Sequence, residues 1–154
     1  MNSMIKKYKN KDCTCLPKDD SPHCGCTCNE NNLALKCGEP ISAIAELPIV
    51  PGTTGTPITV ARVTVDTSCL EEPQIKLNFV VDIASIAGGI FTNIALQVFK
   101  FRYNMSERIP VGQEWFYKDD FTEEVIDSFS FFVFDSDAIE NECYTYILEA
   151  TPYS

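Results

Sequence analysis

The sequence is poor in basic residues and in histidine, and it lacks any long apolar run. Its 154 residues carry 22 Asp and Glu against 12 Lys and Arg, which gives a formal net charge of -10, and a single histidine. An acidic surface does not release counterions from a phosphate backbone, so nucleic-acid binding is excluded. Anionic membrane surfaces are disfavoured for the same reason, and no stretch approaches the roughly 20 apolar residues that span a bilayer. We expect neither nucleic acid nor a membrane among the partners.

Catalytic motifs are missing as well. The only histidine, His23, lies in a polar N-terminal stretch, whereas a nucleophilic site needs a base that is held rigidly. Gly88 and Gly89 form a lone pair that marks a turn and not a phosphate-binding loop. We therefore expect no enzymatic activity and no cofactor.

Cysteine, in contrast, is abundant. Eight cysteines in a chain of this length would be unusual in a reducing cytosol and ordinary in an oxidising exterior. The first residues, MNSMIKKYKNKDC, are basic but lack the apolar stretch of a signal peptide. Both observations fit a protein that is made inside a cell without a classical signal peptide and is exposed later, for example by lysis. We expect an extracellular location.

The chain divides into two parts of different character. From residue 1 to 36 polar residues dominate and no alternation is sustained, and six of the eight cysteines lie between Cys13 and Cys37. We interpret residues 1–36 as a flexible, cysteine-rich connector arm. Residues 37–154 are interpreted as one domain, because a chain of this length supports one hydrophobic core.

The domain alternates apolar and polar residues with the period of two that half-buried strands require. The residues that share one face of a strand or mark its centre are Val60, Val63, Val65, Ile75, Leu77, Phe79, Val81, Ile83, Ile94, Leu96, Val98, Phe129, Phe131, Val133, Tyr144, Tyr146 and Leu148. In the strand that contains Ile94, Phe99 and Phe101 share the opposite face. Strands at such intervals, separated by turn signals, predict an all-β fold, a jelly-roll-like β-sandwich of about eight strands. Residues 117–128, YKDDFTEEVIDS, are interpreted as an acidic loop.

Three interpretations of the arm remain open: a cross-linker, a metal site, and a tail whose cysteines have no specific role. In the pairs Cys13 with Cys15 and Cys26 with Cys28, one residue separates the cysteines, so their Cα atoms lie near the upper limit for a disulfide and they suit other partners better. The soft ligands available for zinc are His23, Cys24, Cys26, Cys28 and Cys37. Structural zinc sites favour longer gaps between their cysteines, so we expect no metal and prefer the cross-linker.

Within the domain, Cys69 and Cys143 have two open roles. They could be buried small apolar residues, or they could form disulfides with each other or with the arm of a neighbour. Trp115 with its neighbours Phe116 and Tyr117 could form a carbohydrate platform, although core packing is the usual role of such residues in a sandwich.

Acidic pairs also occur near the centre of the domain. Asp119 with Asp120, and Glu123 with Glu124, could bind calcium. We prefer solvated loops for these acidic pairs, because no calcium-loop spacing accompanies the carboxylates.

The motifs VTVDTSC, LQVFKF, IPVGQEW, SFSFFVFDSD and CYTYILEAT, in this order, resemble an uncharacterised cysteine-containing domain family of clostridia and related spore-forming bacteria. The likeness covers about Cys37 to Pro152. The plan of that family is similar to that of the endospore appendage (Ena-type) pilins, in which a connector bearing cysteines reaches a neighbouring jelly roll and forms disulfides. The resemblance implies one receiving cysteine early in the domain, matched by Cys37 or Cys69, and one in the last strand, matched by Cys143.

The sequence thus predicts a structural subunit of an extracellular, spore-surface fibre that resembles a pilus. The candidate inter-subunit disulfide residues of the arm are Cys13, Cys15, Cys24, Cys26 and Cys28, and those of the domain are Cys37, Cys69 and Cys143. The expected partner is the chain itself in a homopolymer joined through sheet edges, with other appendage or spore-surface proteins as further partners. The alternatives are a carbohydrate- or surface-binding module and a cysteine-rich metal-binding protein.

Overall fold

The computed structural model of the chain describes residues 2–6, 33–46, 48, 50–67, 70, 72–84, 90–102, 105–121, 126–140 and 142–153. These residues form strands, turns and extended segments. No helix long and apolar enough to cross a membrane occurs among them.

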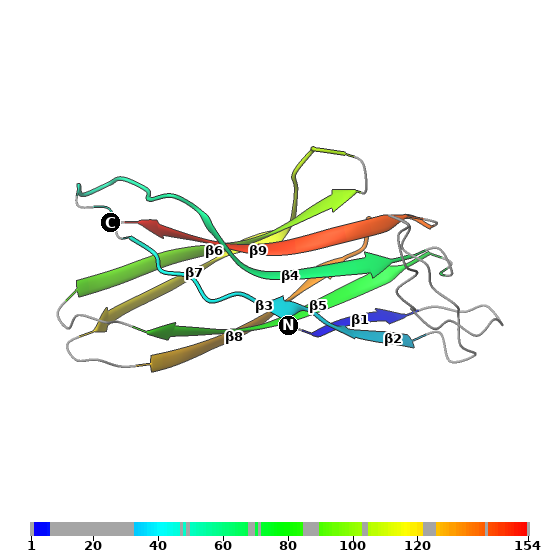
Figure 1. The fold of residues 1–154 in the computed structure, drawn as a ribbon, viewed down its shortest axis with the longest axis horizontal. Coiled ribbons are helices and arrows are strands. Elements are labelled where there is room, and N and C mark those ends of the chain that lie inside the picture. The colour runs from blue at the N-terminus through cyan, green and yellow to red at the C-terminus, as the bar shows by residue number, and fades with distance from the viewer. Residues whose placement is uncertain are drawn as a thin grey trace.

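Two antiparallel sheets lie face to face, as Figure 1 shows. The strands are β1 (Asn2–Lys6), β2 (Leu33–Cys37), β3 (Glu39–Pro40), β4 (Ile58–Asp66), β5 (Gln74–Ala84), β6 (Ile90–Arg102), β7 (Ile109–Phe121), β8 (Ile126–Asp135) and β9 (Cys143–Tyr153). One sheet has the order β2-β1-β5-β8, and the other has the order β3-β4-β9-β6-β7. The prediction of an all-β sandwich is confirmed.

From β4 onward the strands form nested pairs. β4 pairs with β9, β5 with β8, and β6 with β7, all antiparallel. Because β5 and β8 lie in one sheet and the other four in the second sheet, the chain passes repeatedly from one layer to the other. β9 also pairs with β6, so this last strand joins the two halves of the five-stranded sheet.

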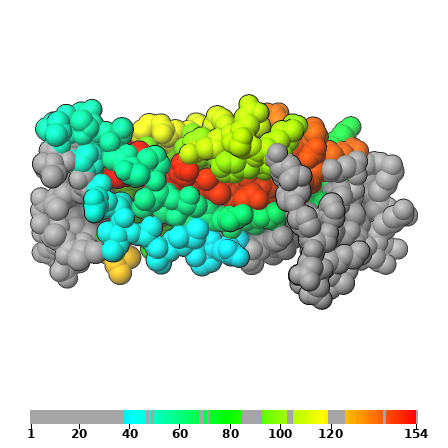
Figure 2. Space-filling view, turned by 45° about the horizontal axis from the view of Figure 1, so that its top comes forward, coloured from blue at the N-terminus to red at the C-terminus, as the bar shows by residue number. Residues whose placement is uncertain are grey.

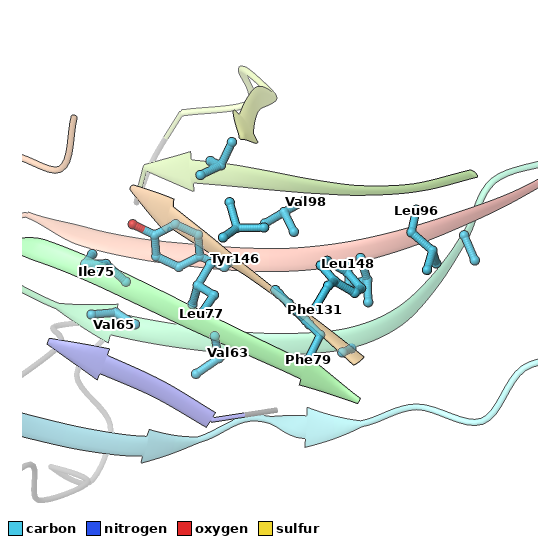
Figure 3. Packing of buried hydrophobic residues seen from close by; sticks show 14 of the residues in the cluster. Val63, Val65, Ile75, Leu77, Phe79, Leu96, Val98, Phe131, Tyr146 and Leu148 are labelled. Carbon is cyan, nitrogen blue, oxygen red and sulfur yellow. The ribbon is translucent and has the colours of Figure 1, made fainter. Parts of the chain in front are cut away.

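The core fills the space between the sheets with alternate side chains of the long strands (Figure 3). Ile75, Leu77, Tyr144, Tyr146 and Leu148 are all fully buried, as their alternation predicts. Aromatic rings pack between neighbouring strands as well, with the ring centroids of Phe79 and Phe131 5.1 Å apart. Burial of this apolar surface is the main stabilising contribution to such a fold.

The acidic stretch after Trp115 is a strand, so the loop interpretation of residues 117–128 is wrong for most of its length. β7 continues to Phe121 and β8 begins at Ile126. Strand-breaking residues at the start of β7, Pro110 and Gly112, obscure this strand in the sequence. An edge strand tolerates both, since one side of its backbone needs no partner, and the register shifts between Leu96 and Val98 where β7 bulges.

Two pieces of the predicted arm belong to the four-stranded sheet. β1 lies between β2 and β5, with Asn2 opposite Asn78 and Lys6 opposite Gln74. The expected boundary between residues 36 and 37 falls within β2. Strand pairing depends on main-chain groups, so a segment without marked alternation can still join a sheet edge.

The segment after β2 runs along the β4 edge of the five-stranded sheet. Figure 2 shows residues 38–46 in cyan beside β4, where β3 pairs with Ala61 and Arg62 and the Ile41 N–H donates to the Val60 carbonyl at 3.1 Å. Farther along, the Gly55 N–H donates to the Pro152 carbonyl at 2.7 Å. The β3 pairing and the Ile41 bond cover part of the outer edge of β4, whereas the Gly55 bond is made to β9 and continues the β4–β9 pairing.

The tight approach of β7 to β8 predicts a large cost for Gly112→Ala. Gly112 has a φ of 70°, and a Cβ added there would lie 2.5 Å from Val133 Cγ1. We expect a loss of about 1–2 kcal/mol in unfolding free energy from the backbone conformation and a further 1–3 kcal/mol, roughly, from overpacking. Gly52→Ala is the matched control, because its φ is 78° and nothing lies within 4 Å of an added Cβ. Equal losses for both variants in chemical denaturation would contradict the close approach.

Candidate functional site

β8 is a regular edge strand. Its residues pair with β5 from Ile75–Asp135 to Ala84–Ile126 without any shift of register. In the described part of the chain, β8 has no second hydrogen-bonded neighbour, and its sequence IDSFSFFVFD contains neither Pro nor Gly. The outer backbone groups of such a strand form a template for pairing with another chain.

The edges of the five-stranded sheet are less suited to pairing. β3 has only two residues. β7 carries Pro110, which lacks an N–H, and the bulge at Gly112. Short strands, prolines and bulges are the usual features that keep an edge from associating. Of the sheet edges that the described residues form, β8 is therefore the longest that no proline, glycine or bulge interrupts.

An aromatic pair lies on the outer face of β8. Phe132 and Phe134 are 51% and 60% exposed, and their rings meet edge to face with centroids 5.5 Å apart. The ammonium of Lys76, on the neighbouring strand β5, lies 4.7 Å from the Phe132 centroid and 5.6 Å from that of Phe134. Val80 and Ile126 add further exposed apolar side chains on the same two strands. Apolar side chains gathered on a surface in this way are typical of an interaction site.

The opposite edge of the same sheet is β2, which pairs with β1 in the described residues. Leu33 lies opposite Lys6 at one end of β2, and Cys37 lies opposite Asn2 at the other end. The sheet therefore has two different edges, one formed by the domain strand β8 and one that ends at a cysteine. If the β8 edge of one copy pairs with the β2 edge of another copy, the contact is head-to-tail.

Cys143 is the one candidate disulfide residue whose side chain the structure describes. It is the first residue of β9, lies opposite Asp66 in the register, and is disulfide-bonded. The side chains of the other candidates, Cys13, Cys15, Cys24, Cys26, Cys28, Cys37 and Cys69, lie outside the described residues. The pairing scheme and the role of the arm stay predictions.

The candidate carbohydrate platform does not form one face. Trp115 is partly buried against the core, with its ring centroid 5.4 Å from that of Phe131. Tyr117 is buried and its hydroxyl donates to Asp127 at 2.8 Å, whereas Phe116 between them is exposed. The alternation of β7 thus turns two of the three aromatic residues toward the core, as the core-packing interpretation expects.

No group of three or more potential metal ligands occurs within the described residues. Of the candidate calcium carboxylates, Asp119 and Asp120 belong to β7. Glu123, Glu124 and His23 lie outside the described part of the chain. The zinc interpretation of the arm lies there too and stays a prediction.

A buried polar cluster links the two sheets and was missed by sequence reasoning. Lys100 Nζ donates to both carboxylate oxygens of Asp135, at 2.8 and 2.9 Å, and the Tyr146 hydroxyl donates to Asp135 Oδ2 at 2.6 Å. Burial, the charge of Asp135 and the hydrogen bond to it raise the pKa of Tyr146 far above its usual range, so the hydroxyl stays protonated. The signal in the sequence is the continuation of the inward series Leu96, Val98 to Lys100, because a period of two places this lysine in the core.

The fold and the surface define a class: a two-layer β-sandwich whose described residues include a long, regular edge strand, β8, and a cysteine-bearing N-terminal segment. The chain belongs to the family described as Domain of unknown function (DUF4489), which matches residues 31–154. This range contains β2 to β9, both edges of the four-stranded sheet, and the three cysteines Cys37, Cys69 and Cys143. No curated protein and no solved structure matches the chain.

Proposed function

We propose that this chain is a non-enzymatic subunit of a self-assembling extracellular fibre that grows by pairing one sheet edge with another. The observation that carries the proposal is β8, whose register is unbroken and whose outer face exposes Phe132 and Phe134. Folded proteins usually blunt such edges because they pair with other chains. For this chain, pairing of β8 with another copy is the proposed function.

The acceptor is the β2 edge of a second copy. Because β8 and β2 are different edges of one sheet, the contact is heterologous, and repeated addition extends a filament when the rotation does not close. Main-chain hydrogen bonds give the contact its affinity, and side chains such as Phe132 give it specificity. The exposed aromatic pair would lose its contact with water at each new contact, which favours association.

The resemblance to clostridial spore-former proteins and to Ena-type appendages leads to the same function independently of the edge. The nested pairs β4–β9, β5–β8 and β6–β7 support a jelly-roll form of the sandwich. On this basis the fibre lies on the spore surface, and other appendage or spore-surface proteins are its further partners. The abundance of cysteine suits such an oxidising location.

Disulfides then make the association covalent. Cys37 ends the β2 edge, so a cysteine of the chain lies at the proposed contact. Cys143 is already disulfide-bonded, and an arm thiolate from a neighbour could attack its sulfur, so that the existing S–S bond breaks, the present partner leaves as a thiolate, and no added oxidant is needed. A disulfide typically stabilises a folded protein by about 2–4 kcal/mol. A disulfide between subunits also makes their dissociation depend on reduction.

Negative-stain microscopy beside a non-reducing gel tests the proposal. We expect filaments and a ladder of covalent oligomers, and the ladder collapses when reductant is added because the cross-links are disulfides. A variant with serine at Cys13, Cys15, Cys24, Cys26 and Cys28 is expected to form filaments without a ladder, which separates edge pairing from cross-linking. Monodisperse monomers without a ladder under oxidising conditions would contradict the fibre proposal.

Lysines on the outer face of β8 should prevent assembly. The double variant Phe132→Lys/Phe134→Lys removes two apolar side chains, each worth about 1.5–3 kcal/mol when buried, and adds the charges that natural edges use against pairing. We expect the critical concentration for assembly to rise by roughly tenfold or more, while circular dichroism shows a folded monomer. The control is Phe116→Lys on β7, because Phe116 is 60% exposed, as is Phe134. If the control is impaired as much as the double variant, β8 is not the assembling edge.

A further inference from the structure

The buried cluster around Asp135 brings an amine and a carboxyl together from facing sheets. Lys100 belongs to β6, and Asp135 is the last residue of β8. Both are almost inaccessible, at 4% and 3% exposure. Nζ lies 2.8 and 2.9 Å from the two carboxylate oxygens, so the fold holds Nζ close to Cγ, the two atoms that a condensation would join.

As an ion pair this cluster is costly. Removing two charges from water costs several kcal/mol, roughly, per ion, and the attraction between them often fails to exceed that cost. A further neighbour of Lys100 is the ring of Tyr144, whose centroid lies 5.4 Å from Nζ. The surroundings also include two fully buried apolar residues, Val98 and Ile75, and Ile75 lies opposite Asp135 in the register. An uncharged amide would avoid the cost of desolvating two charges.

We propose that Lys100 and Asp135 condense into an intramolecular isopeptide bond between Nζ and Cγ. A proton first passes from the ammonium of Lys100 to the carboxylate of Asp135, which leaves a neutral amine and a neutral acid. The nitrogen lone pair then forms the C–N bond at Cγ, and the C–Oδ1 bond breaks as that oxygen leaves with two protons as water. One water is released for each amide formed, and no oxidant or reductant takes part.

Two donors act on the two carboxyl oxygens, one on the oxygen that stays and one on the oxygen that leaves. The Tyr146 hydroxyl donates to Oδ2 at 2.6 Å, and the Asp137 N–H donates to Oδ1 at 3.0 Å. Tyr146 lies directly opposite Lys100 in the register of β9 and β6, so its position is fixed by strand pairing. Donors held in place where negative charge develops on a carbonyl oxygen lower the barrier, and they are worth most where water is excluded. Oδ2, held by Tyr146, becomes the amide oxygen.

The bond would tie the two layers of the sandwich together. Lys100 lies in the five-stranded sheet and Asp135 in the four-stranded sheet, 35 residues apart in the sequence. A covalent link between the layers would resist their separation, and unlike a disulfide it would persist under reducing conditions. Its formation needs only one folded chain and does not depend on assembly into a fibre.

Intact mass spectrometry of the full chain, reduced and alkylated at its cysteines, tests this inference. We expect the folded protein to be lighter than its sequence mass by one water, and proteolysis to give a branched peptide that joins the segments around Lys100 and Asp135. The full sequence mass in folded, aged protein would overturn the inference. A water loss that maps to another position, such as a cyclic imide, would overturn it as well.

Two variants complete the test. Lys100→Arg keeps a positive charge beside Asp135 but removes the nucleophilic amine, so we expect the full sequence mass, and a persistent water loss would refute the assignment. Tyr146→Phe keeps the ring in the core and removes only the donor. We expect it to lose water at least about tenfold more slowly than the unaltered chain, and an unchanged rate would show that Tyr146 does not activate Asp135.

Discussion

The structure depends above all on β9, the strand that lies between β4 and β6 in the five-stranded sheet. Tyr144, Tyr146 and Leu148 place their side chains in the core and are fully buried. Hydrogen bonds to β4 on one side and β6 on the other hold the first and middle parts of the domain together. Because this strand comes last in the sequence, the sheet is complete only when the ends of the domain meet, and contacts of such large sequence separation are typical of slowly folding all-β proteins.

The two-layer arrangement also explains why the edges matter. A sandwich leaves strand edges at the margins of its sheets, whereas a closed barrel has none. In this chain the margins differ: Pro110 and the Gly112 bulge interrupt β7, while β8 runs in register along β5. In the proposed fibre, an edge that remains regular and carries Phe132 and Phe134 on its outer face would direct association to one margin of the molecule. Direction of this kind is what linear growth of a fibre requires.

Much of the fold could be predicted from the sequence, because alternation with a period of two marks which side chains face the core. The inward positions of Leu77 and Tyr146 follow from their neighbours alone. β7 could not be recognised in this way, since the bulge at Gly112 breaks its alternation and only its place at the edge makes Pro110 acceptable. Lys100 was overlooked because a charged residue is not expected inside, although its position continues the inward series.

The candidate site was less accessible to sequence reasoning than the core. Which strand lies at an edge depends on the strand order, and the order is fixed by pairings between distant segments such as β5 with β8. The cysteines are visible in the sequence, but their pairing depends on which thiols the fold brings together. The aromatic pair of β8 alternates with inward residues in the sequence, and its exposure follows only once β8 is placed on β5.

Amide hydrogen exchange of the full chain, compared between its monomeric and assembled forms, tests the central claim most directly. If β8 is the assembling edge, the amides of residues 126–135 that do not bond to β5 become protected on assembly, as do those of β2, while the outer amides of β7 exchange as before. Assembled protein in which β8 exchanges as it does in the monomer would contradict this account.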